Sequence, residues 1–289
     1  MEQKEEGEGH IFRNLILIFF IIIFLLGFLI LLIYYFKDKT CGDGTLYNEC
    51  SLNQPYFCEN GMLIEKAGVC SCPENFSIKE DSCFSKYMTN PRAISLNYSL
   101  NNEIKEINFI VYRGFYEYST NIPRFIRYNE NETPTKRDFK LKSINSLLQR
   151  DFLIPLVVKI QNLEKDGDTQ VKIAISIVQN IPYNEADNLT SIEGAFNYKY
   201  PYEVLYDMVG ICSEKSDLLV LLLKELGYGV AILYYPLEDH EAVGVKCPVK
   251  KSIEGSGYCF IETTSPENVK PFSIPEVIEI SDGKTADFF

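Results

Sequence analysis

Three residues in the C-terminal third of the chain, Cys212, His240 and Glu262, are of the types that thiol catalysis requires. A thiol nucleophile needs a base within hydrogen-bond reach, and the base needs a third group that fixes its tautomer. The chain has 2 histidines, and the other one, His10, lies near the N-terminus. The sequence therefore offers His240 as the base for Cys212 and Glu262 as the acid that orients His240.

Cys212 stands at the start of an apolar run that predicts a buried helix ending at Gly227. The first N–H groups of a helix have no intrahelical acceptor, and together with the helix dipole they favour a thiolate over a thiol. This position suits a nucleophile. The same cysteine could instead be a small buried hydrophobic residue, which is the commoner role of a free cysteine.

His240 and Glu262 belong to a region in which three strands are predicted: Val230 to Tyr235, Ala242 to Cys247, and Tyr258 to Thr263, with a loop from Pro248 to Gly257. His240 falls at the entry of the second strand, where a surface role is the plain alternative. Glu262 falls at the end of the third strand and shares a face with Tyr258 and Phe260. A carboxylate in water is the plain alternative for Glu262.

The elements upstream are less regular. The residue types predict strands over 93–128, most clearly from Ile104 to Tyr118. A mostly helical stretch, Lys140 to Leu163, should break or kink at Pro155. A second helix should follow, capped by Asp168 and Thr169, and the polar stretch from Tyr183 to Ala195 predicts a surface loop.

An uncharged apolar run, residues 15–36, predicts one transmembrane helix, because about 22 residues rising roughly 1.5 Å each cover a hydrocarbon core of roughly 30 Å. Residues 1–14 would form a cytoplasmic tail. Basic residues do not set the orientation, since Lys4 and Arg13 on one side are balanced by Lys37 and Lys39 on the other.

Six cysteines crowd into residues 41–83, directly after the apolar run: Cys41, Cys50, Cys58, Cys70, Cys72 and Cys83. So short a segment has few large apolar residues, and disulfides outside the cytoplasm are the usual remedy. A metal cluster is the weaker alternative, because paired CxxC knuckles and histidines are missing. The C-terminal side is therefore expected to be extracytoplasmic, where four sequons could be used: Asn75, Asn97, Asn131 and Asn188.

The net charge of -12 and the pI of about 4.8 argue against a nucleic-acid partner. No calcium-loop pattern occurs, and two histidines are few for a metal protein, so neither a cofactor nor a metal is expected.

The order of these motifs resembles the transglutaminase-like branch of the papain-type thiol enzymes, including archaeal membrane-anchored members. The residues that carry the resemblance are Gly210-Ile211-Cys212 at the helix start, Leu226-Gly227 at its end, His240 before a Val-rich strand, and Tyr258, Glu262 and Thr264. The match covers 171–266. The family's usual acid is Asp, so Glu262 departs from the pattern by one methylene group.

The resemblance implies an α+β fold over 93–289, in which the buried helix that carries the cysteine packs on an antiparallel sheet. It implies acyl transfer on peptide or protein amides by Cys212, His240 and Glu262, with Gln179 as an oxyanion donor; Gln179 could instead cap the preceding helix. Hydrolysis by a cysteine peptidase or amidase is the first expectation, and crosslinking by transamidation is the alternative. A catalytically inactive surface adhesion or scaffold protein is the alternative of another class. The cysteine module could bind cell-surface material or act as a spacer.

The cysteine count bears on the same region. Six in the module leave three, and Cys247 could pair with Cys259, so that Cys212 would be the free thiol. If Cys247 lay directly opposite Cys259, however, His240 would face Pro266, roughly 13 Å along the strand from Glu262. Disulfide and triad would then conflict unless the strands bulge or diverge, and the triad would be kept before the disulfide.

Overall fold

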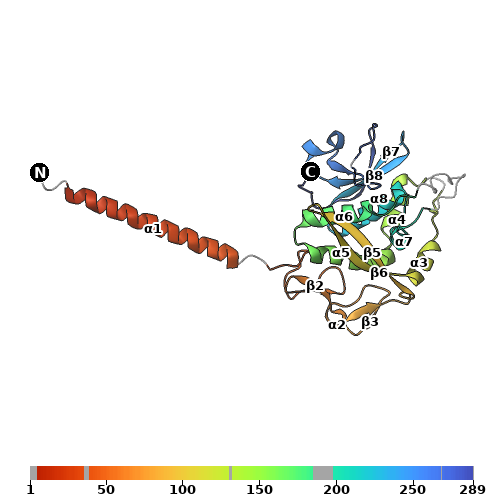
Figure 1. The fold of residues 1–289 in the computed structure, drawn as a ribbon, viewed down its shortest axis with the longest axis horizontal. Coiled ribbons are helices and arrows are strands. Elements are labelled where there is room, and N and C mark those ends of the chain that lie inside the picture. Colours follow the sequence, from red (N-terminus) through yellow and green to blue (C-terminus); the bar gives the residue numbers. More distant parts are fainter. Residues whose placement is uncertain (1–4, 36–38, 130–131, 185–197, 268, 289) are drawn as a thin grey trace. The chain divides into compact units, whose positions relative to one another are not determined.

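The computed structural model describes residues 5–35, 39–129, 132–184, 198–267 and 269–288 (Figure 1). The chain divides into two compact units, Met1–Lys39 and Thr40–Phe289. The predicted loop from Tyr183 to Ala195 lies almost wholly outside the described residues, as do Asn131 and Asn188; Asn75 and Asn97 are exposed.

The first unit contains one helix, α1, which spans Glu5–Tyr35 over 31 residues. It includes the predicted transmembrane segment up to Tyr35. Side chains are described for residues 13–29, and all of them are exposed within the unit. Over the described part of the chain, no helix is both long enough and apolar enough to span a membrane.

The second unit is a mixed α+β fold that begins with the cysteine module. Three disulfides join Cys41 to Cys58, Cys50 to Cys70, and Cys72 to Cys83, which confirms the predicted stapling. The elements of the module are short: β1 (Tyr56–Glu59), β2 (Met62–Glu65), α2 (Ala67–Cys70), β3 (Ser77–Lys79) and β4 (Ser82–Phe84). Such elements have little core of their own, so the disulfides supply constraint that burial does not.

The module packs on a long helix, α5 (Leu147–Leu163). The side-chain amide of Asn162 accepts from the Leu63 N–H at 2.8 Å and donates to the Leu63 carbonyl at 2.9 Å, so it pairs with β2 as a neighbouring strand would. A Cβ atom on Gly42 would lie 1.9 Å from the Gln161 carbonyl oxygen, so the two backbones touch. The module is therefore part of the second unit, and its use as a separate spacer is not supported.

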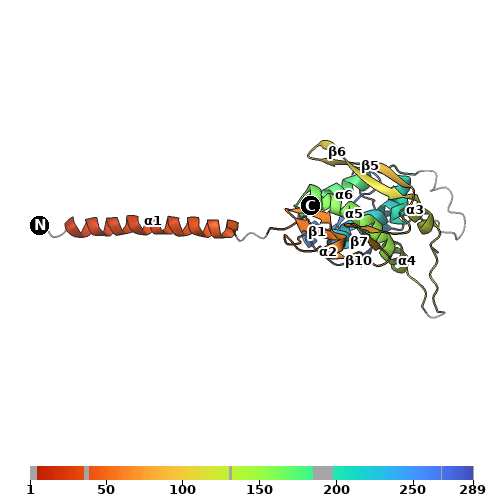
Figure 2. The same cartoon turned by 90° about the horizontal axis from the view of Figure 1, so that it is seen from below.

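A hairpin of two ten-residue strands follows, β5 (Pro91–Leu100) and β6 (Glu103–Tyr112). Its alternating apolar residues are buried against α6 (Gly167–Gln179), which it covers on one side of the molecule (Figure 2). The predicted strand from Ile104 to Tyr118 is wrong beyond Tyr112, where α3 (Arg113–Thr120) begins. The buried residues change there from every second residue to Phe115 and Ser119, four apart, which is the spacing of one helix face.

The predicted helical stretch from Lys140 to Leu163 is two helices, α4 (Lys136–Ile144) and α5. The break predicted at Pro155 is wrong, because α5 continues through the proline and the helical stretch is interrupted between Ile144 and Leu147 instead. The alternative, a kink at Pro155, stays a prediction. The residues around Pro155 are buried in the core, and this packing outweighs the lost backbone hydrogen bond. Asp166 caps α6 in place of the predicted Asp168 and Thr169, because its carboxylate accepts from the Thr169 N–H three residues on.

The C-terminal part forms a four-stranded antiparallel sheet in the order β10-β7-β8-β9. The strands are β7 (Val230–Tyr235), β8 (His240–Lys246), β9 (Tyr258–Ile261) and β10 (Glu276–Ser281). The prediction for β7 is confirmed, whereas β8 begins two residues earlier and β9 ends two residues earlier than predicted. Two short 3-10 turns, Val249–Lys251 and Ile253–Gly255, lie in the predicted loop.

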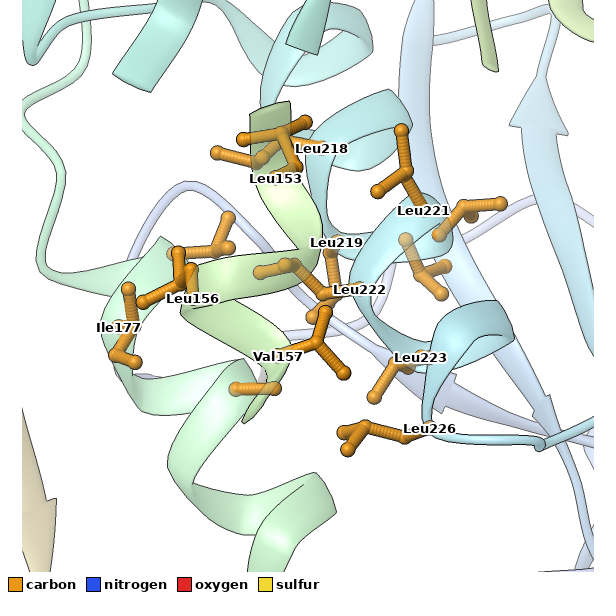
Figure 3. Close-up of a cluster of buried hydrophobic side chains, with 14 of the residues drawn as sticks. Leu153, Leu156, Val157, Ile177, Leu218, Leu219, Leu221, Leu222, Leu223 and Leu226 are labelled. Carbon is orange, nitrogen blue, oxygen red and sulfur yellow. The ribbon is translucent and has the colours of Figure 1, made fainter. Parts of the chain in front are cut away.

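The predicted buried helix is confirmed as α8 (Cys212–Glu225), which follows α7 (Pro201–Asp207). It lies between the sheet on one side and α5 with α6 on the other (Figure 1). Its leucines are all but fully buried, and Leu218, Leu219 and Leu222 lie beside α5 (Figure 3). Gly227 ends the helix with φ of 89°, a conformation that glycine adopts without strain.

Candidate active site

Cys212 is the first residue of α8, and its side chain is 9% exposed. The first helical bond of α8 runs from the Lys215 N–H to the Ile211 carbonyl at 2.9 Å, so the N–H of Cys212 precedes the helical ladder. Gly210 lets its backbone lie close to the side chains of Val204 and Glu214, because a Cβ atom on residue 210 would lie 3.2 Å from Val204 and 3.3 Å from Glu214. The Glu214 carboxylate in turn accepts from the Ile211 N–H at 3.1 Å and closes the helix start.

His240 is the first residue of β8 and pairs with Tyr235 across the end of the β7–β8 hairpin. Its Nε2 lies 2.9 Å from Oε2 of Glu262, and Cys212 is close enough to act on the pKa of its imidazole. Since Nε2 is engaged with the carboxylate, Nδ1 is the nitrogen left for the sulfur. Cys212, followed by Glu262, raises the pKa of His240 to about 10 and favours an imidazolium.

Glu262 lies directly after β9 and is 5% exposed. Its second oxygen, Oε1, accepts three hydrogen bonds of 2.8 Å, from the Thr263 N–H, the Thr264 N–H and the Thr264 hydroxyl. Burial by itself would raise the pKa of Glu262, but the hydrogen bonds from His240 and Thr264 outweigh it and hold the pKa below its usual range. The acid is therefore ionised and fixed in orientation.

The Cys247–Cys259 disulfide is present together with the His240–Glu262 contact, and its Cα–Cα distance is 5.7 Å. The predicted conflict assumed that the two cysteines lie directly opposite, and this assumption is wrong. Val245 lies opposite Cys259, so the disulfide is diagonal, with a register offset of two residues. Because β9 ends at Ile261, the pairing also stops before Glu262 and leaves its side chain free to turn towards His240.

All nine cysteines fall within the described residues, and Cys212 is the free one. The other eight form the three disulfides of the module and the Cys247–Cys259 disulfide, a pairing that the sequence left open.

Gln179, the predicted oxyanion donor, is the last residue of α6. Its side-chain amide donates to the Glu262 carbonyl at 2.8 Å, so it lies beside the acid of the site. The alternative role as a cap of α6 is filled by other groups, since Asn180 donates to the Ser176 carbonyl at 2.8 Å. The oxyanion role of Gln179 stays a prediction.

Two residues that the sequence analysis missed, Lys215 and Ser216, are fully buried one turn after Cys212. The Ser216 hydroxyl donates to the Glu241 carbonyl at 3.2 Å and lies 3.2 Å from the Thr263 hydroxyl. It thereby joins α8 to the neighbours of both His240 and Glu262. Their spacing in the sequence could have revealed them, because residues three and four positions after Cys212 lie on its face of the helix, and both are polar although the rest of the helix is largely apolar.

A cluster of charges joins α4 and α8 to Glu241, the residue after His240. The ammonium of Lys140 on α4 lies 2.9 Å from Asp217 on α8 and 2.6 Å from Glu241 on β8, and Lys136 lies 3.0 Å from Glu241. Opposite charges that are buried together offset part of their desolvation cost. The cluster fixes α4, α8 and β8 relative to one another next to the site.

No three His, Cys, Asp or Glu side chains of the described residues are grouped so that they could hold a metal ion. Comparison of the chain with protein-family models, with curated proteins and with solved structures found no match in any of the three.

Proposed function

We propose that the protein is a thiol acyl-transfer enzyme that acts on peptide or protein amides through Cys212, His240 and Glu262. One observation carries the proposal: His240 is hydrogen-bonded to a buried, fixed carboxylate, and the free Cys212 acts with that carboxylate to raise the pKa of the same imidazole. A cysteine that only packs in a core needs no such partner. We propose that the fold belongs to the transglutaminase-like branch of the papain-type enzymes, because the sequence motifs around these three residues resemble those of that family.

In the proposed first step, the sulfur of Cys212 attacks the amide carbonyl carbon and forms a C–S bond, while the carbonyl oxygen becomes an oxyanion. The imidazolium of His240 then gives its proton to the amide nitrogen as the C–N bond breaks and the amine leaves. Glu262 stabilises the imidazolium and holds the ring in place. The product of this step is a thioester on Cys212.

The Cys212 N–H supports oxyanion stabilisation, because it belongs to the helix start, where N–H groups lack helical acceptors. The amide of Gln179 is the proposed second donor, since an amide nitrogen has two hydrogens and the contact with Glu262 uses one.

In the second step, His240 takes a proton from the acceptor as the acceptor attacks the thioester, and the thiolate leaves. Water as acceptor gives a peptidase or amidase, which is the proposed activity. A primary amine as acceptor gives a transamidase that crosslinks proteins, and both acceptors follow the same steps.

We also propose that residues 15–36 anchor the chain in a membrane, with residues 1–14 cytoplasmic and the second unit extracytoplasmic. The uncharged apolar run of the sequence, residues 15–36, supports the anchor, and it extends beyond residues 13–29, the part of α1 whose side chains are described. Four disulfides support an oxidising compartment. Protease added to intact cells should degrade the second unit and leave 1–14 protected. Retention of the protein in an alkaline-washed membrane pellet checks the anchor.

The pH dependence of Cys212 alkylation by iodoacetamide tests the enzyme, because the other eight cysteines are in disulfides. We expect the full-length protein in detergent to be alkylated faster at pH 6 than His240→Gln, because a protonated His240 beside the sulfur assists its reaction as a thiolate. An inert thiol, or one that titrates identically without His240, would instead favour an inactive adhesion or scaffold protein. Release of a dye from quenched peptides, against incorporation of a fluorescent amine, then separates hydrolysis from transamidation.

A further inference from the structure

Lys215 is a fully buried lysine in the second turn of α8, and the proposed chemistry does not use it. Its ammonium donates to three main-chain carbonyl oxygens: Ile181 at 2.6 Å, Gln179 at 3.4 Å and Thr264 at 3.4 Å. An ammonium has three N–H donors and no acceptor, so three carbonyl groups match its capacity. The carbonyl of Gln179 belongs to the last residue of α6, that of Ile181 lies two residues further on, and that of Thr264 lies in the segment after β9.

The burial of Lys215 is unfavourable for packing alone. None of the ion pairs among the described residues includes it, and burial lowers its pKa to about 8, which the negative charge of Glu262 partly opposes. An apolar side chain of the same length would fill the space without this desolvation. The lysine therefore has a role that an apolar residue would not fill.

The contacts form a closed circuit around the site. Lys215 donates to the Gln179 carbonyl, the Gln179 amide donates to the Glu262 carbonyl, Glu262 accepts from Thr264, and the Thr264 carbonyl accepts from Lys215. The lysine lies three residues after Cys212, on the same face of the helix. It is thus the point at which the cysteine helix is joined to the segments that carry Gln179 and Glu262.

We propose that Lys215 is a positioning residue, whose ammonium holds the end of α6 and the segment 262–264 at a fixed place relative to the first turn of α8. The inference rests on the proposed acyl-transfer function. The positions of His240 and Glu262 relative to Cys212 then depend on the ammonium of Lys215, which touches none of the reacting atoms.

Few charged groups face Lys215. The charged group of the segment after β9 that acts on Lys215 is Glu262, whose carboxylate is hydrogen-bonded to His240. The end of α6 presents main-chain carbonyl groups to the ammonium. On its own helix, Cys212 is one turn away, and Glu214 is occupied by the N–H groups of Ile211 and Lys199.

The test compares Lys215→Met with Lys224→Met in the full chain. Lys224 is on the same helix but contacts Asn145, away from the site. The imidazole NMR signals report the pKa of His240, because the chain has 2 histidines and His240→Gln assigns one of them. We expect Lys215→Met to lower the His240 midpoint by about one pH unit or more and to shift the Cys212 alkylation profile towards that of His240→Gln. Lys224→Met should match the wild type in both.

An unchanged His240 midpoint and alkylation profile in Lys215→Met, with only a lower melting temperature, would overturn the positioning role and leave the proposed enzyme intact. If the wild-type alkylation profile does not depend on His240 at all, both proposals fail. Should Lys215→Met not fold, Lys215→Gln, which keeps a donor for the nearest carbonyl, carries the same measurements. A wild-type His240 midpoint in that variant would also overturn the inference.

Discussion

His240 and Glu262 meet at 2.9 Å although no strand pairing joins them. The ladder between β8 and β9 ends at Val243 and Ile261, so both residues lie beyond its last pair. The contact depends on where β9 stops and on the length of the Glu262 side chain. Each of these conditions can be changed by substitution.

Glu262→Asp should weaken the site although it restores the acid that is usual in the proposed family. The shorter side chain cannot keep both Oε2 on His240 and Oε1 on the three donors of Thr263 and Thr264. We expect alkylation of Cys212 at pH 6 to slow about tenfold, which is about 1.4 kcal/mol. Glu276→Asp, at an exposed position of β10, is the matched control. A wild-type rate in Glu262→Asp would show that the chain can move to accommodate Asp.

The Cys247–Cys259 disulfide should matter for the site as well as for stability. Replacing both cysteines by serine should lower the free energy of unfolding by about 2 to 4 kcal/mol, because a constraint on the unfolded chain is lost. It should also broaden the pH profile of Cys212 alkylation, since the disulfide holds β8 on β9.

The Cys72–Cys83 pair is the natural control for that experiment. Its sequence separation is 11 residues, close to the 12 residues of Cys247–Cys259, but it lies in the module. Serine at both positions should lower the melting temperature and leave the alkylation profile unchanged. Equal effects of the two double variants on the profile would contradict a specific role for the Cys247–Cys259 bond.

His240 should make stability depend on pH in a defined direction. Its folded-state pKa is raised to about 10, so between about pH 6.5 and 10 the folded state binds more protons than the unfolded state. The stability that it contributes is fully present below about pH 6.5 and is lost as the pH rises towards 10. Lys215 acts in the opposite direction between about pH 8 and 10.4, because its pKa is lowered.

Urea unfolding at pH 6, 8 and 9.5 measures this dependence. The difference in free energy of unfolding between the wild type and His240→Gln isolates the histidine, since Lys215 is common to both. We expect the difference to shrink as the pH rises. A difference that does not vary with pH would contradict the raised pKa of His240.

Asn162→Ala should loosen the cysteine module from α5. The substitution removes both hydrogen bonds to Leu63 and leaves its N–H and carbonyl without their partner, at an expected cost of about 1 to 3 kcal/mol. Limited proteolysis should then cut the connector between residues 84 and 91 faster. Asn108→Ala, on the exposed face of β6, should have no such effect. Unchanged proteolysis of Asn162→Ala would mean that the apolar contacts of the module hold it by themselves.

Local patterns predicted much of the second unit. The apolar run after Cys212 and the glycine at 227 were enough for α8, because a helix that is apolar on every face can only be buried. Six cysteines in a short segment were enough for the stapled module. The predicted ends of helices and strands were wrong where tertiary packing competes with local preference, as at Pro155 and in the segment after Tyr112.

By itself, the sequence offered the residue types that thiol chemistry needs: a cysteine at a helix start, a histidine at the entry of a strand and an acid at the end of another strand. It did not determine their distances, because these depend on the register of β8 on β9, and a shift of two residues moves a side chain by roughly 7 Å. The tertiary structure decided that register through the diagonal disulfide and the early end of β9. It also brought Lys215 to three distant carbonyl groups, which no local pattern encodes, since such contacts form only when α6, α8 and the sheet pack together.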